Sequence, residues 1–371
     1  MTFEEIGEEE FRHYADTSPY RSFMQTPEIA KYRESNGWTV YYLAAKHGQE
    51  IKAATMLVAK PTFLGKSTFI APGGPLLDLE DQPLTDFFFR SLKKYIKSHN
   101  GYHLHISPYY EITERDRHGD PIKGGFNHQK AISNLKNLGF IELKNASQPK
   151  YMYALTIDGK TPEELMKDFK SNTRGHIRKA EKMNVKIREL KKDELAIFKQ
   201  ITESTSKRRE FTDRPLEYYE QMYDLFVPRK EAMFLVAEVE NAPSKTTGQQ
   251  KKSASTPPSR LPLSVAMFML YGSEIVYLFS GSDEKYMRDY NAQYELQWYM
   301  IKYAATHGFK RYNFYGIHGL PDDSRPDGVY EFKKGFGGQV LEYVGTYELS
   351  ISPFFYNLHH ILSGLKQQRS K

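Results

Sequence analysis

The chain has 371 residues, a formal net charge of +6 and no cysteine. This length predicts roughly two domains, since a single hydrophobic core rarely serves more than about 250 residues. The absence of cysteine excludes a disulfide framework, a thiolate zinc site and a cysteine nucleophile, and favours a reducing compartment. The acidic N-terminus lacks an apolar signal segment, and no run of about 18 uncharged apolar residues occurs, so we expect a cytoplasmic protein without a membrane span. The positive charge favours an anionic partner, although it shows only that electrostatics would assist the encounter.

The first 149 residues alternate between helical and strand patterns. Thr26 followed by Pro27 predicts a helix start, because threonine caps a helix and proline fits its first turn. Residues 38–46 and 51–60 predict two strands joined as a hairpin around Gly48. A strand that ends in the Gly-Pro loop at 72–75, an amphipathic helix at 84–98 and a strand at 102–108 follow. This order predicts a mixed α/β unit.

A second unit begins near residue 150. Residues 151–157 predict a strand, and Thr161-Pro162 followed by two glutamates predicts a helix start with acidic residues in its first turn. A helix at 215–225, strands at 233–239, 263–270 and 274–280, and a helix at 292–307 ended by Gly308 complete the unit. Residues 241–260 are mainly Ser, Thr, Pro, Gly, Gln and Lys, which predicts a flexible surface loop between two strands.

The stretch 312–338 is the strongest candidate for chemistry. An aromatic strand ends at Gly316, a polar loop follows, and a second aromatic segment presents Lys333 and Lys334 ahead of a glycine-rich run. A lysine held beside Phe332 and open backbone N–H groups could stabilise a developing oxyanion. The alternative is a gatekeeper lysine, which protects a strand end from unwanted pairing.

Residues 167–192 carry ten basic residues against three acidic ones. In a helix, Arg174, Arg178 and Lys182 would lie on one face, and such a face attracts phosphates. The alternative is an ordinary solvated helix surface.

A polar loop with Arg214 leads into the helix predicted at 215–225. Arg214 precedes Pro215, and Tyr218 stands one turn inside the helix, so a guanidinium, a phenol and a helix N-terminus could together hold a pyrophosphate. Alternatively, Asp213 caps this helix and Arg214 pairs with it.

Several common catalytic motifs are absent from the sequence, including the phosphate-binding P-loop, the Gly-x-Gly-x-x-Gly dinucleotide loop, His-Glu-x-x-His and Gly-x-Ser-x-Gly. His103 and His105 alternate along one predicted strand with no third ligand nearby in the sequence. We therefore interpret these histidines as structural, and expect neither a metal nor a cofactor.

Five separated motifs occur in a recognisable order. They are Thr173-Arg-Gly-His-Ile-Arg-Lys-Ala180, Arg214-Pro-Leu-Glu-Tyr-Tyr219, Ala292-Gln-Tyr-Glu-Leu-Gln-Trp298, Tyr312-Asn-Phe-Tyr-Gly316 and Tyr330-Glu-Phe-Lys-Lys-Gly-Phe336. Together they resemble the Fem family of non-ribosomal peptidyltransferases (FemA, FemB, FemX and MurM types), which build peptidoglycan interpeptide bridges. The resemblance implies an α/β (α+β) fold with two tandem acetyltransferase-like (GNAT) domains and mixed central sheets. Residues 1–149 would form the first, completed by a C-terminal helix within 346–371, and residues 150–345 the second.

The resemblance also implies a reaction and its partners. An aminoacyl group would pass from aminoacyl-tRNA to the lysine side-chain amine, or the growing bridge, of a muramyl-pentapeptide carried as lipid II or as UDP-MurNAc-pentapeptide. Lys333 and Phe332 would be the catalytic residues, and the substrate-binding residues would be Lys31, Arg214, Tyr218 and Tyr277. From charge alone we add a tRNA or membrane-surface contact through Arg174, Arg178 and Lys179. We expect a monomer that contacts the inner membrane face peripherally.

Three departures from the family pattern narrow the resemblance. FemA and FemB types carry a long coiled-coil arm where this chain has the short segment 241–260, so FemX-like members are more similar. Ser107-Pro108 stands where relatives often have Asp-Pro, so we assign no carboxylate base there. Phe279 replaces a tyrosine of some relatives, which removes a phenol from that position.

Two other functions remain open from the sequence. A CoA-dependent N-acetyltransferase could use the same fold, although the chain lacks a recognisable pyrophosphate loop between a strand and a helix. A non-catalytic RNA- or membrane-surface-binding protein would rely on residues 167–192, and would not need Lys333.

Overall fold

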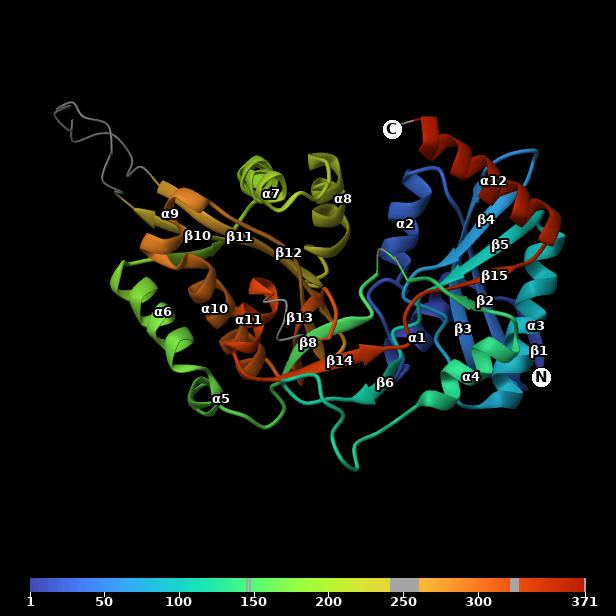
Figure 1. Ribbon diagram of the computed structural model, residues 1–371, viewed down its shortest axis with the longest axis horizontal. Coiled ribbons are helices and arrows are strands. Elements are labelled where there is room, and N and C mark those ends of the chain that lie inside the picture. The colour runs from blue at the N-terminus through green and yellow to red at the C-terminus, as the bar shows by residue number, and fades with distance from the viewer. Residues whose placement is uncertain (145, 147, 241–259, 321–326, 370–371) are drawn as a thin grey trace. The chain divides into compact units, whose positions relative to one another are not determined.

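The computed structural model describes residues 1–371 except 145, 147, 241–259, 321–326 and 370–371 (Figure 1). The predicted loop 241–260 therefore lies outside the described residues apart from Arg260. Two compact units emerge, one formed by residues 1–152, 316–320 and 340–371, and the other by residues 153–315 and 321–339. We call them unit 1 and unit 2. Among the described residues, no helix is both long enough and apolar enough to cross a membrane.

Unit 1 is built on a mixed seven-stranded sheet of order β1-β2-β3-β4-β5-β15-β7. Strands β4 and β5 are parallel, whereas the other described pairs are antiparallel. The strands are β1 (Thr2–Glu5), β2 (Thr39–His47), β3 (Glu50–Pro61), β4 (Ser67–Ala71), β5 (Gly101–Ile106), β7 (Ile141–Glu142) and β15 (Tyr347–Ser350). Outside this sheet, β6 (Glu111–Glu114) pairs antiparallel with β14 (Gln339–Tyr343). The helices are α1 (Glu8–Thr17), α2 (Pro27–Ser35), α3 (Gln82–Ser98), α4 (Gln129–Asn137) and α12 (Pro353–Arg369).

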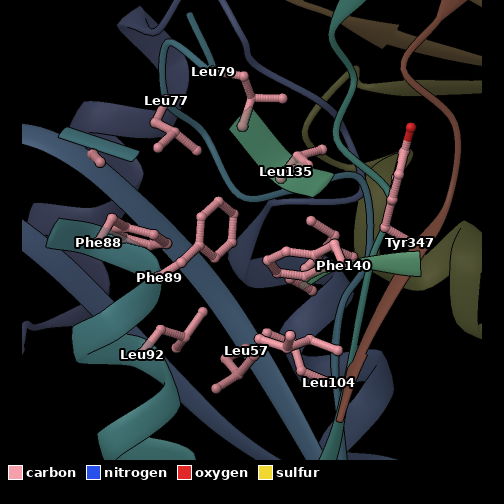
Figure 2. Close-up of a cluster of buried hydrophobic side chains, with 14 of the residues drawn as sticks. Leu57, Leu77, Leu79, Phe88, Phe89, Leu92, Leu104, Leu135, Phe140 and Tyr347 are labelled. Carbon is pink, nitrogen blue, oxygen red and sulfur yellow. The ribbon is translucent and has the colours of Figure 1, made fainter. Parts of the chain in front are cut away.

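The core of unit 1 lies between this sheet and helices α3 and α4. Phe88, Phe89 and Leu92 project from α3 toward Leu57 of β3 and Leu104 of β5 (Figure 2). Because side chains alternate across a strand, the residues between these core positions face the other side of the sheet, where the ring of Phe11 in α1 stacks on that of Tyr42 in β2.

Local signals in the sequence account for several boundaries of unit 1. The side chain of Thr26 accepts a hydrogen bond from the Ile29 N–H and Pro27 opens α2, which confirms the predicted helix start. Strands β2 and β3 pair as the predicted antiparallel hairpin, with Gly48 at a positive φ of 63° in the turn. The C-terminal helix α12 contacts β5.

Unit 2 contains a second mixed sheet, in which the strands run in the order β8-β13-β12-β11-β10-β9. Strands β12 and β13 are parallel, and β9 to β12 pair antiparallel. The strands are β8 (Tyr151–Thr156), β9 (Lys186–Glu189), β10 (Ala232–Glu240), β11 (Arg260–Tyr271), β12 (Glu274–Ser282) and β13 (Arg311–Ile317). The helices are α5 (Pro162–Asp168), α6 (Ser171–Lys182), α7 (Leu195–Arg209), α8 (Leu216–Phe226), α9 (Glu284–Tyr290), α10 (Ala292–Thr306) and α11 (Gly328–Lys334), with a 3-10 turn at Lys192–Glu194.

Two helical layers cover the sheet of unit 2. Helices α7 and α8 bring the rings of Phe198 and Tyr219 together beside Phe234 of β10. On the other side, α10 packs on β10 and β11 and contacts α6 (Figure 1). The capping box between Thr161 and Glu164 confirms the predicted start of α5. Both units are therefore mixed α/β structures, as the sequence predicts.

Candidate functional site

Lys333 lies near the end of the short helix α11 and is buried, with only 5% of its surface exposed. Its ammonium Nζ donates a hydrogen bond of 3.1 Å to the backbone carbonyl of Tyr315 in β13. Burial lowers the pKa of Lys333 to about 7, and the nearby charge of Asp327 partly opposes this shift. The amine can therefore switch between its charged and neutral forms near neutral pH, which is a property of catalytic lysines.

The backbone of Tyr315 is held in an unusual conformation. Its φ of 64° lies in the left-handed region, which a bulky residue rarely adopts. Asn313, which is fully buried, accepts a 2.8 Å hydrogen bond from the Tyr315 N–H, and its own amide donates to Glu274 at 3.1 Å. We infer that Asn313 fixes this turn and so directs the Tyr315 carbonyl at Lys333. The sequence reasoning missed Asn313, although asparagine is a residue whose side chain often hydrogen-bonds to the backbone two residues further on.

Phe332 packs inside unit 2 against aromatic rings from other motifs. Its ring lies 5.0 Å from that of Tyr294 in α10 and 5.4 Å from that of Phe336. Tyr294 in turn lies 4.5 Å from the ring of His176 in α6. Three of the five sequence motifs therefore meet around one aromatic cluster, which holds α11 in place.

Two glycines of the run 335–338 are required by close packing. A Cβ at Gly335 would collide with the side-chain hydroxyl of Thr173 in α6. Gly338 has a φ of 91°, and a Cβ there would collide with the carbonyl oxygen of Ala154 in β8. The glycines thus allow the chain after Lys333 to pass against α6 and β8, rather than forming an open N–H loop.

Arg214 and Tyr218 meet at the start of α8. The Arg214 guanidinium lies over the Tyr218 ring, 5.3 Å from its centre, which is a cation–π distance. The positive charge of Arg214 also acts on the Tyr315 phenol, whose pKa burial raises to about 12. Arg214 therefore lies near the side chain of Tyr315, the residue whose carbonyl accepts the hydrogen bond from Lys333.

Asp213 has a different role from the one considered from sequence. Its carboxylate accepts hydrogen bonds from Lys199 (2.8 Å), Thr202 (2.8 Å) and Tyr219 (2.6 Å). The N-cap of α8 is Pro215, which provides no side-chain cap. The alternative that Asp213 caps α8 and pairs with Arg214 is wrong, and Asp213 instead anchors the loop before α8 to α7.

A register shift in β12 separates Tyr277 from Phe279. The pairing of β11 with β12 changes between Met267 and Phe268, so Met267 lies opposite Phe279 and Phe268 lies opposite Tyr277. The Phe279 ring packs 5.7 Å from that of Tyr218. The Tyr277 ring instead packs 5.5 Å from that of Phe268 in β11, and burial raises the pKa of its phenol to about 12. The structure therefore places Tyr277 away from Arg214 and Tyr218.

Comparison with known proteins places the chain in a family. The model of the FemAB family matches residues 6–256 and 240–363. The chain belongs to the FemAB family. Among curated relatives, Aminoacyltransferase FemA of Staphylococcus aureus (strain bovine RF122 / ET3-1) is 27% identical over 420 residues, covering 99% of this chain and 100% of the relative. The family resemblance drawn from the five motifs is thus confirmed.

Solved structures confirm the fold of this FemAB-family chain. The crystal structure of FemX superposes with a TM-score of 0.80 at 21% identity, covering 96% of this chain and 99% of that one. A tandem GNAT protein from the clavulanic acid biosynthesis pathway superposes with a TM-score of 0.54 at 10% identity, covering 95% and 99%. The predicted tandem acetyltransferase-like architecture is therefore correct.

The remaining predicted residues of this FemAB-family chain lie on its surface. Lys31 on α2 of unit 1 is exposed and lies 3.5 Å from the Glu8 carboxylate. On α6, Arg174 donates to backbone carbonyls at the end of α5, at Lys167 and Phe169. Lys179 donates to the Arg288 carbonyl at 2.8 Å. Arg178 is exposed, and makes no ion pair or hydrogen bond with any residue that the structure describes.

Proposed function

We propose that the protein transfers an aminoacyl group from aminoacyl-tRNA to the lysine side-chain amine, or to the growing bridge, of a peptidoglycan precursor muramyl-pentapeptide. The precursor would be lipid II or its UDP-linked form. The enzyme class follows from the comparisons, because the chain belongs to the FemAB family and aligns over nearly its whole length with Aminoacyltransferase FemA. The chain is an aminoacyltransferase.

The observation that carries the proposed mechanism is the buried Lys333, bonded to the Tyr315 carbonyl. An aminoacyl ester is already activated, so the acceptor amine can attack its carbonyl carbon without a side-chain nucleophile on the enzyme. A C–N bond forms, the ester C–O bond breaks, and the amine loses a proton as the tRNA ribose hydroxyl leaves. The protonated Lys333 would stabilise the tetrahedral oxyanion or the leaving ribose oxygen, and a charge acts more strongly in a buried site than in water.

We propose that Arg214 and Tyr218 bind the phosphates of the precursor. A guanidinium recognises phosphate through several N–H donors, and stacking on the Tyr218 ring restricts its orientation before substrate arrives. Independently, we propose that Lys31 in unit 1 binds a phosphate, since its ion pair among the described residues is with the partly exposed Glu8. We leave Tyr277 out of this phosphate site, because its ring packs on Phe268 of β11, whereas Phe279 is the β12 residue whose ring packs on Tyr218.

For the tRNA or membrane surface we propose α6, with Arg178 as its principal contact. Arg174 and Lys179 already donate to backbone carbonyls, so a phosphate would have to compete with those bonds. Arg178 has no such competition among the described residues. Lipid II and tRNA both carry the phosphates that a basic helix attracts, and their contributions can be separated by competition with uncharged tRNA.

The deciding experiment combines purified protein, a panel of charged tRNAs and a lysine-containing precursor, with the product mass as readout. We expect one precursor to gain the mass of one aminoacyl residue, and acetyl-CoA to yield no product. Lys333→Met should abolish most of this gain, whereas Lys334→Met should retain it. Lys334 is the matched control because its amine lies over the Tyr330 ring and near Glu331, away from the Tyr315 carbonyl. If no tRNA and precursor pair gives a mass gain, the proposed reaction is wrong.

A further inference from the structure

His103, His105 and Glu348 form a cluster in unit 1 that the transfer reaction does not use. The two histidines alternate on β5 and so share one face of the sheet, and Glu348 of β15 pairs directly across from His105. Both Nε2 atoms approach the same carboxylate oxygen, at 3.1 Å from His103 and 3.5 Å from His105. The three ligand atoms all lie within 4.8 Å of one another. Glu348 is the third partner that the sequence did not reveal, because it lies 245 residues from His103.

Neighbouring side chains orient the cluster. The Thr68 hydroxyl of β4 lies 3.3 Å from Nδ1 of His103, which leaves Nε2 of this ring directed at Glu348. Tyr356 of α12 donates its hydroxyl to the other oxygen of Glu348. Outer hydrogen bonds of this kind, to the far ring nitrogen and the far carboxylate oxygen, are typical of residues that bind metals. These two hydrogen bonds fix the orientation of the His103 ring and of the Glu348 carboxylate relative to each other.

We propose that His103, His105 and Glu348 bind a divalent transition metal, with Zn²⁺ as the best match. Two imidazoles and one carboxylate are a common zinc ligand set that leaves a fourth position for water. With bonds of about 2.0–2.1 Å, neighbouring ligands of a tetrahedral ion stand roughly 3.3 Å apart, and the two measured separations lie on either side of this value. His103 and Glu348 are buried, whereas the His105 side chain is 32% exposed, so a metal can enter past His105.

The proposed site would couple α12 to the sheet. One carboxylate oxygen of Glu348 would bind the metal, and the other accepts the hydrogen bond from the Tyr356 hydroxyl. The ion would therefore strengthen the contact between β15 and α12. A ligand that binds only the folded state raises thermal stability by mass action. The proposed metal site shares no residue with the proposed transfer site, so the two proposals can be tested independently.

The test uses the full chain without an affinity tag, stripped of metal by a chelator and dialysed. Titration with Zn²⁺ against a chromophoric chelator should give one tight site per chain, and Co²⁺ should give the intense visible absorption of a tetrahedral ion. His105→Gln should weaken Zn²⁺ binding at least tenfold and remove the Co²⁺ band. The matched control is His47→Gln, which alters an exposed histidine at the end of β2 and should change neither.

A second variant separates coordination from folding. Thr68→Val leaves all three ligands in place and removes only the hydroxyl next to His103, so it should weaken Zn²⁺ binding by about 10- to 100-fold. Failure of the unaltered protein to bind Zn²⁺ in the micromolar range would overturn the proposal. Equal affinities in the parent, His105→Gln and His47→Gln proteins would overturn it as well, because the metal would then be held elsewhere.

Discussion

The pH dependence of aminoacyl transfer tests the proposed role of Lys333. The attacking group is a neutral lysine amine, whose ordinary pKa is about 10.4, so its reactive fraction rises about tenfold per pH unit below pH 10. Lys333 must be protonated to stabilise negative charge, and above its own pKa of about 7 the protonated fraction falls about tenfold per unit. The two effects cancel above pH 7. We therefore expect kcat/KM to rise with unit slope up to about pH 7 and then to level off.

Two substitutions at Lys333 should change this profile in different ways. Lys333→Arg keeps its charge at every accessible pH, so the rise should continue through pH 8.5, although at a lower rate because the Tyr315 carbonyl is placed for an ammonium. Lys333→Met removes the charge and should lower kcat about 10²- to 10³-fold, the usual cost of losing one oxyanion donor. This corresponds to about 2.7–4 kcal/mol of transition-state stabilisation, while KM for the precursor should change little.

The assay is single-turnover transfer from labelled aminoacyl-tRNA between pH 6 and 8.5, corrected for spontaneous ester hydrolysis. Lys334→Met serves as the control, and should keep both the plateau and a rate within about threefold of the parent protein. A parent profile that rises with unit slope to pH 8.5 would refute the proposed link between the ionisation of Lys333 and the rate. A plateau that persists in Lys333→Met would assign the ionisation to another group.

Four further predictions concern stability and substrate binding. Because the pKa of Lys333 is lowered in the folded protein, the unfolded chain binds more protons between about pH 7 and 10.5, and the free energy of unfolding should rise with pH in this window. Urea unfolding should show a rise of at most about 2.7 kcal/mol from pH 7 to 9, and this rise should be missing in Lys333→Met. Asn313→Ala should lose about 1–3 kcal/mol of stability and lower kcat more than it raises KM, because it releases the Tyr315 turn, and equal changes in kcat and KM would argue against this positioning role. Arg214→Ala should raise KM for the precursor about tenfold and weaken its salt dependence, with Arg209→Ala as an exposed control, whereas Arg178→Glu should raise KM only for aminoacyl-tRNA.

The sequence predicted most of the elements because their signals are local. The cap at Thr26, the capping box at Thr161 and the glycine after α10 each act within a few residues of the boundary that they set. The order of five motifs likewise identified the family before any contact was known. Residues 330–334, in contrast, carry no clear helical periodicity, and the structure shows that they belong to a short helix whose Phe332 packs against Tyr294 and Phe336.

The parts of the site that the sequence did not predict depend on contacts between distant residues. The pKa of Lys333 follows from burial, which no local pattern reports, and its partner is a backbone carbonyl that any residue type would provide. The separation of Tyr277 from Tyr218 depends on a register shift in β12, and one residue of shift reverses which face a side chain occupies. Glu348 belongs to a strand that reaches His105 only through the fold of unit 1.

The burial of Lys333 lowers the stability of the protein but strengthens the interaction that its charge can make with an oxyanion. Removal from water disfavours the charged form of an ammonium, and the Tyr315 carbonyl at 3.1 Å restores part of the lost hydration. The same poor solvation makes the charge a stronger partner for an oxyanion, because little solvent has to reorganise when negative charge develops. The turn at Asn313, the aromatic packing of Phe332 and the close contact at Gly338 each hold one side of this environment rigid. Loosening any of them should bring the pKa of Lys333 back toward 10.5 and weaken catalysis at the same time, so the two quantities should change together across variants of these three residues.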